Sequence, residues 1–184
     1  MLNLLKNNVM IKKVIAGFII IFYKLYYYKR LKIVLPSISF TRTPFLLFFN
    51  SSTIIGKKAI IGKESQIINK GIITIGNNFC LNKYSRIVSH ENVVIGNNVT
   101  IAQFVSVLDH DHAYIVDNNE MKLKGYITAP IFIGNNVWIA DKVTICKGVK
   151  IGDNVIIGAN SVVTKDIENN SIAAGIPCVK IRNI

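Results

Sequence analysis

Residues 133–168 read IGNNVW-IADKVT-ICKGVK-IGDNVI-IGANSV-VTKDIE, which are six consecutive hexads that each begin with an aliphatic residue. The second position is mostly Gly, Ala or another small residue, and the fifth is mostly small or β-branched. A period of six matches neither an amphipathic helix nor the simple alternation of a strand. It predicts short strands separated by corners, so that three hexads close one coil of about 18 residues.

The same phase extends backwards to Ile55. Sets of three hexads begin at Ile55, Ile75 and Ile95, and each set is separated from the next by two extra residues or by a longer break. One aliphatic residue per hexad is predicted to point inward, while small residues and Asn at the corners permit the bends. Parallel pairing of coils about 4.8 Å apart predicts an all-β solenoid over residues 51–184.

The basic charge is concentrated before the repeats. The chain has 184 residues and a net charge of +12. Residues 1–50 contain eight Lys and Arg and no acidic residue, whereas residues 51–184 contain 14 basic and 10 acidic residues. This imbalance argues against a folded nucleic-acid-binding face. It predicts an N-terminal helical arm and connector over residues 1–50, with residues 2–32 lying on a membrane surface or packing in an oligomer.

Other features of the chain favour a cytoplasmic protein, working at the inner face of the membrane if the arm binds there. The apolar run at 14–23 is too short to span a bilayer and lacks the small-residue cleavage site of a signal peptide. The three cysteines form no CxxC pair, which argues against a disulfide framework or a cysteine-based zinc site.

The hexad phase breaks at residues 109–126, which read DHDHAYIVDNNEMKLKGY. An inserted loop of this length is predicted to act as a lid or a binding loop. The only three histidines lie in or beside it. His90 and His110 each occupy the fourth position of a hexad, and their separation equals one coil plus the two extra residues. They are therefore predicted to stack on adjacent coils.

The repeats, together with AAGIPCVKIR after them, resemble the left-handed parallel β-helix of the hexapeptide-repeat acetyltransferases, and in particular the enzymes that acetylate sugars and surface polysaccharides. The resemblance covers roughly residues 53–184. It implies a homotrimer with active sites between the columns, acetyl-CoA as cosubstrate, and no metal. It also implies a carbohydrate acceptor, with the hydroxyl of a surface polysaccharide favoured, and no nucleic-acid partner.

The resemblance also assigns roles to residues. A histidine at the mouth of the inserted loop acts as general base, and His110 matches it, with His112 as the competing candidate. Asp109, Asp111 or Glu91 could orient the imidazole. Asn82 matches a residue that faces the acceptor, and His90 stands where sugar acetyltransferases often have an acidic residue, so both are assigned to acceptor binding. Backbone N–H groups near Trp138 and Ala140 are expected to stabilise the oxyanion.

Coenzyme contacts are implied along the upper coils. Trp138 would lie beside the pantetheine arm and small residues would expose backbone groups to its amides, although Asp141 stands where relatives often have Gly or Ser. Cations near the C-terminus would meet the phosphates. The complete set implied by the resemblance is Trp138, Ala140, Asp141, Ala159, Thr164, Lys165, Pro177, Lys180 and Arg182.

Three alternatives stay open at this point. The acceptor could be a small free molecule, such as a simple sugar, serine or an antibiotic. The three histidines could instead hold zinc, as in hexapeptide-repeat carbonic anhydrases, although the usual ligand spacing is not matched. The column could also be a non-catalytic scaffold. A metal assay distinguishes the second alternative, and failure to bind CoA favours the third.

Overall fold

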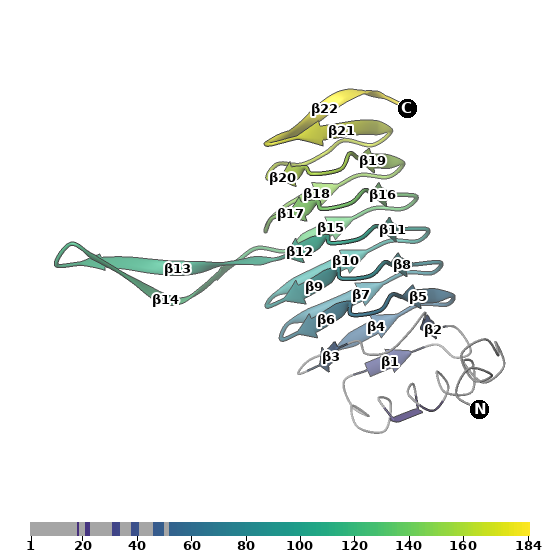
Figure 1. The fold of residues 1–184 in the computed structure, drawn as a ribbon, viewed down its shortest axis with the longest axis horizontal. Coiled ribbons are helices and arrows are strands. Elements are labelled where there is room, and N and C mark those ends of the chain that lie inside the picture. Colours follow the sequence, from purple (N-terminus) through teal and green to yellow (C-terminus); the bar gives the residue numbers. More distant parts are fainter. Residues whose placement is uncertain (1–17, 19–20, 23–30, 34–37, 41–45, 50–51) are drawn as a thin grey trace, which may run out of the picture.

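The computed structural model describes residues 18, 21–22, 31–33, 38–40, 46–49 and 52–184. Their strands are stacked as the rungs of one column, and the chain climbs from the N-terminal to the C-terminal end (Figure 1). Every coil passes through three parallel sheets in turn. The column therefore has three flat faces and three corners, as the hexad period predicts.

The first face is a six-stranded sheet. In spatial order it consists of β1 (Leu31–Ile33), β4 (Thr53–Ile55), β7 (Ile72–Ile75), β10 (Asn92–Ile95), β15 (Ile131–Ile133) and β18 (Lys150–Ile151). The second face is an eight-stranded sheet that ends in an antiparallel pair. It consists of β2 (Ile38–Phe40), β5 (Ala59–Ile61), β8 (Cys80–Leu81), β11 (Thr100–Ile101), β16 (Trp138–Ile139), β19 (Val155–Ile157), β21 (Ser171–Gly175) and β22 (Cys178–Asn183).

The third face is again a six-stranded sheet. From the bottom of the column upwards it consists of β3 (Leu46–Phe49), β6 (Gln66–Asn69), β9 (Arg86–Ser89), β12 (Ser106–Leu108), β17 (Thr144–Ile145) and β20 (Val162–Val163). We call the turn from the first to the second face the first corner, the next turn the second corner, and the turn from the third face back to the first the third corner.

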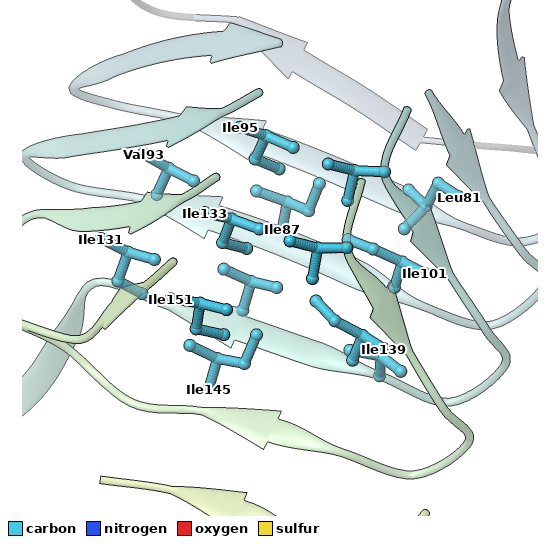
Figure 2. Packing of buried hydrophobic residues seen from close by; sticks show 14 of the residues in the cluster. Leu81, Ile87, Val93, Ile95, Ile101, Ile131, Ile133, Ile139, Ile145 and Ile151 are labelled. Carbon is cyan, nitrogen blue, oxygen red and sulfur yellow. The ribbon is translucent and has the colours of Figure 1, made fainter. Parts of the chain in front are cut away.

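The core is a stack of aliphatic side chains inside the column (Figure 2). The first residue of each hexad is buried, as predicted; Ile101, Ile139 and Ile145 have no exposed surface. The prediction of one inward residue per hexad is wrong, however, because the fifth position is buried as well, as at Phe79 and Val99. The fifth residue lies two before the next hexad's first residue, and residues two apart on a strand share a face.

The pairing registers confirm the coil lengths that the repeats predict. In the lower part of the column Thr74 pairs with Val94, so one coil there takes up three hexads and the two extra residues. In the upper part Phe132 pairs with Lys150, so one coil there takes up three hexads alone. The extra two residues of the lower coils are accommodated where the third face turns into the first.

The column begins one coil earlier than predicted. Strands β1, β2 and β3 pair in parallel with β4, β5 and β6, although residues 31–49 were expected to be arm and connector. This extra coil covers strand edges that would otherwise expose unpaired backbone groups. Leu31 and Lys32 belong to β1 and not to the helix predicted over residues 2–32, and most of that segment lies outside the described residues. Among the described residues, none belongs to a helix that is long and apolar enough to cross a membrane.

The inserted segment is a β-hairpin and not an irregular loop. Strand β13 (His110–Asp117) pairs in antiparallel fashion with β14 (Glu120–Thr128), and the pair projects from the column (Figure 1). The two turn residues, Asn118 and Asn119, have positive φ angles of 49° and 61°. Asparagine tolerates this conformation, and two such residues in succession form the tight turn favoured in hairpins. The hairpin begins at His110, so it starts within the candidate site.

Candidate active site

The predicted histidine stack is present at the third corner. The rings of His90 and His110 are parallel to within 6°, with centroids 3.8 Å apart. Each histidine follows a third-face strand, β9 or β12, and the two strands pair in register. Parallel pairing therefore places the two imidazoles directly above one another. This arrangement confirms the prediction made from their one-coil spacing.

Asp109 anchors this corner from inside the column. Its carboxylate is fully buried. Oδ1 accepts a hydrogen bond from the His90 backbone N–H at 2.8 Å and lies 3.2 Å from His110 Nδ1. Oδ2 accepts hydrogen bonds from Ser89 Oγ and from the backbone N–H groups of residues 91 and 92, each at 2.9 Å. A buried carboxylate is stable when this many donors surround it.

The Asp109 contact determines what His110 can do. When the carboxylate accepts a hydrogen bond from Nδ1–H of a neutral imidazole, Nε2 is the nitrogen left with a lone pair to take up a proton. The His110 side chain retains 14% of its surface exposed. His110 is therefore oriented by Asp109 and reachable from outside, which are properties a general base needs.

The other two candidates for orienting the imidazole face elsewhere. Asp111 pairs with Lys147 at 2.7 Å, across to the next coil. Glu91 is exposed and contributes its backbone N–H to Asp109. His112, the competing base, is exposed on the hairpin and lies 4.9 Å from the Tyr126 ring, measured between centroids. The geometry therefore favours His110 with Asp109, although this assignment stays a prediction.

Sequence reasoning missed several residues at this corner. Tyr126, on β14, packs edge-on against His90 with centroids 4.2 Å apart, and Lys70 Nζ lies 5.5 Å from the Tyr126 ring. Lys70 occupies the same hexad position as His90, one coil earlier, so the spacing rule that found the histidines would have found it. Tyr126 had no such signal because the pairing within the hairpin determines its position.

The pKa of His90 is lowered from its ordinary value of 6.5. The largest cause is desolvation, followed by the charges of His110 and Lys70, while Asp109 acts in the opposite direction. The folded protein therefore takes up this proton less readily than the unfolded chain. Stability attributable to neutral His90 is fully present above pH 6.5 and is lost as the pH falls through the lower folded value.

We accordingly expect the melting temperature of the wild type to fall on acidification below pH 6.5 more steeply than that of His90→Gln, because glutamine cannot be protonated. Thermal unfolding followed by circular dichroism between pH 7.5 and 5 measures the difference. If the melting temperatures of the two proteins changed in parallel with pH, the expectation would be contradicted. His112→Gln, at the exposed histidine on the hairpin, is the matched control.

The implied coenzyme residues are spread over the upper part of the column. Trp138 lies on the outer surface of the second face and is 51% exposed, within a shallow cavity of about 450 Å³ that also involves Asn98 and Asn136. Ala140, Asp141 and Ala159 lie at the second corner. Thr164 and Lys165 are exposed at the third corner, two coils above His110. Asn82 is at the second corner, where its Nδ2 donates to the Ile101 carbonyl at 2.9 Å.

Several of these residues have structural partners. The Asp141 carboxylate accepts a hydrogen bond from the Gln103 N–H at 3.0 Å, which accounts for an acidic residue at a position where Gly or Ser was expected. The Ala140 N–H donates to the Ile157 carbonyl at 3.0 Å, so this group is already paired within the column, and the oxyanion role of the backbone near Trp138 and Ala140 stays a prediction.

The C-terminal candidates lie at the top of the column. Lys180 pairs with Glu168 at 2.9 Å, which lowers the pKa of that carboxyl group. Arg182 donates to the Asn183 carbonyl at 3.3 Å, and Pro177 is exposed in the turn between β21 and β22. Among the described residues, no group of three or more His, Cys, Asp or Glu side chains is arranged to hold a metal ion.

Residues 130–165 match the family model described as bacterial transferase hexapeptide (six repeats). The hexads read from the sequence thus match known hexapeptide repeats in the upper part of the column. The galactoside O-acetyltransferase of Escherichia coli (strain K12) is 54% identical to this hexapeptide-repeat chain over 68 residues, which are 36% of this chain and 34% of that protein. The match thus spans about a third of the curated relative.

Solved structures extend the similarity along the hexapeptide-repeat column. A galactoside acetyltransferase in complex with coenzyme A is 35% identical, with a TM-score of 0.57, over 80% of this chain and 64% of that one. A hexapeptide-repeat acetyltransferase from Vibrio cholerae O1 biovar eltor, complexed with acetyl coenzyme A, also has a TM-score of 0.57. It is 23% identical over 88% of this chain and 75% of that one, so it shows the fold alone. The solenoid predicted from the hexads, and the left-handed β-helix that the resemblance implies, are confirmed.

Proposed function

We propose that this hexapeptide-repeat chain is an O-acetyltransferase that transfers the acetyl group of acetyl-CoA to a sugar hydroxyl, favouring a bacterial surface polysaccharide. The observation that carries the proposal is His110, held by a buried carboxylate at the mouth of a cavity. The similarity to a galactoside acetyltransferase bound to coenzyme A supports the coenzyme and the sugar.

The proposed reaction needs only one proton carrier. His110 Nε2 takes the proton of the acceptor hydroxyl while the hydroxyl oxygen attacks the thioester carbonyl. When the tetrahedral intermediate collapses, the carbon–sulfur bond breaks. The imidazolium then returns its proton to the departing CoA thiolate. Asp109 stabilises the transient imidazolium through Nδ1, and no covalent enzyme intermediate is required because the thioester is already activated.

One copy of the chain does not bring these groups together. His110 and Lys165 lie at the third corner, whereas Asn82 and Ala140 lie at the second corner. Trp138 belongs to a different cavity from His110. A second copy packed against the first would place the second face and second corner of one column opposite the third corner of another. Cyclic association, such as the expected homotrimer, would repeat that arrangement at every interface.

The first test of the proposal is acetyl-CoA binding, measured by calorimetry with wild type and Trp138→Ala. We expect the replacement to weaken binding by about tenfold or more, because a large exposed aromatic surface leaves the pantetheine contact. Tyr114→Ala, which removes an exposed aromatic of the hairpin, is the matched control. Absence of acetyl-CoA binding by the wild type would refute the proposed function.

The composition of the residues before the column supports a further part of the proposal, which concerns where in the cell the protein works. The basic arm at residues 2–32 suits contact with an anionic membrane surface, where surface glycans are assembled. Because the arm lies almost entirely outside the described residues, its composition is the support for this part of the proposal.

A further inference from the structure

A cavity of about 460 Å³ opens on the third face, beside the histidine stack. Its floor consists of Ile68, Val88 and Leu108, which lie in register on β6, β9 and β12. His90 and His110 line the cavity at the third corner. An apolar floor beside a general base suits the C–H face of a sugar ring, with the reacting hydroxyl directed at the imidazole.

Cationic side chains flank this floor. Lys70 lines the corner side of the cavity and Arg86 lines the opposite side, where its Nε donates to Ser106 Oγ at 3.0 Å. Among the described residues that line the cavity, the one acidic side chain is Asp111, which is paired with Lys147. The charge of Lys70 also contributes to lowering the pKa of His90, which indicates a positive potential at the corner side of the cavity.

The position of these cations separates them from the implied coenzyme contacts. Lys70 follows β6 and Arg86 lies on β9, both on the N-terminal side of β12, which leads into His110 (Figure 1). Trp138 and Lys165 lie on the C-terminal side, on β16 and after β20. Acetyl-CoA and the acceptor must both reach His110. Because the implied coenzyme contacts lie on the C-terminal side of His110, the N-terminal side of the column is left for the acceptor.

We infer that this cavity binds an acidic sugar, with Arg86 and Lys70 holding its carboxylate while the reacting hydroxyl faces His110. This inference rests on the proposed function and narrows it to a class of acceptor. Both cations would attract a carboxylate placed between them, whereas a neutral sugar would gain no such attraction. A planar guanidinium is well suited to a carboxylate, which it can bind with two hydrogen bonds.

Direct binding tests the inference without requiring turnover. The probes are the methyl glycosides of glucuronic, galacturonic and N-acetylneuraminic acids, each compared with its carboxyl-reduced counterpart, in the presence of saturating CoA. NMR titration of the wild type is expected to show about tenfold tighter binding of at least one acidic member over its neutral partner. Arg86→Gln and Lys70→Gln are expected to remove that preference.

The controls separate the possible outcomes. Lys57→Gln changes a cation at the first corner and should leave sugar binding unchanged, and acetyl-CoA affinity should be equal in all these proteins. Equal binding within every pair, no binding of any acidic probe, or weakened acetyl-CoA binding in Arg86→Gln would each overturn the inference. If acetyl-CoA binds normally but acetyl is transferred to neutral sugars alone, the acidic acceptor is refuted and the proposed function is kept. If acidic sugars bind but acetyl-CoA does not, the proposed function alone is refuted.

Discussion

Replacing His110 with alanine is expected to lower kcat for acetyl transfer by about 10²- to 10⁴-fold, the range that a positioned general base contributes. The reason is geometric. Asp109 holds Nδ1 at 3.2 Å, so Nε2 is the nitrogen presented to the acceptor hydroxyl. The loss should appear in kcat, because alanine removes a proton acceptor and leaves the coenzyme contacts higher on the column in place. Release of CoA, followed with a thiol reagent, measures the rate.

His112→Ala is the matched control for this prediction. It removes an imidazole two residues away, on the same strand, that is exposed and does not contact the buried carboxylate. Its rate should stay close to that of the wild type, with acetyl-CoA affinity unchanged in both variants. A large loss in His112→Ala together with near-normal turnover in His110→Ala would assign the base to the other histidine and contradict the site described here.

Replacing Asp109 with alanine is expected to lower both stability and activity. The side chain is fully buried and accepts hydrogen bonds from Ser89 Oγ and from three consecutive backbone N–H groups at the His90 corner. Bonds to a charged acceptor contribute about 1.5–3 kcal/mol each, and buried donors left without a partner add their desolvation cost. Because such losses are not additive, we expect the free energy of unfolding to fall by about 3 kcal/mol or more.

Urea unfolding followed by circular dichroism measures this loss, and Asp111→Asn provides its comparison. Asp111 is exposed and forms a single surface ion pair with Lys147, so its replacement should change stability by less than about 1 kcal/mol. Asp109→Asn keeps the shape of the side chain but presents an amide N–H₂ to N–H donors. Its free energy of unfolding should therefore lie between those of Asp109→Ala and Asp111→Asn. If Asp109→Ala were as stable as Asp111→Asn, the carboxylate would not be the anchor of the corner.

The repeats predicted much of this site because a solenoid converts sequence spacing into spatial stacking. A residue one full coil after His90 on a paired strand had to lie above it, which is where His110 is found. The same rule applies to Lys70, and Asp109 follows from its place directly before His110. The buried fifth positions were equally regular and were missed because only the first residue of each hexad was assigned to the core.

Other features depend on interactions that spacing does not encode. Tyr126 reaches His90 through the register of the hairpin, which the Asn118–Asn119 turn determines and the hexads do not. The extra coil formed by β1–β3 pairs with β4–β6 without a readable repeat. The acidic residue at position 141 is explained only by the structure, in which the Asp141 carboxylate accepts a hydrogen bond from the backbone N–H of Gln103. That Trp138 and His110 lie apart on one column is known only from the structure, which shows which face or corner each residue occupies.

The most direct test of the central proposal, acetyl transfer in a site completed by two copies, is subunit complementation. His110→Ala and Trp138→Ala, each slow at low acetyl-CoA concentration, would be unfolded together, refolded as a mixture and assayed for acetyl transfer. If each site takes His110 from one copy and Trp138 from another, random mixing restores roughly a quarter of the wild-type sites. A mixture no more active than the average of the separate variants would contradict this account.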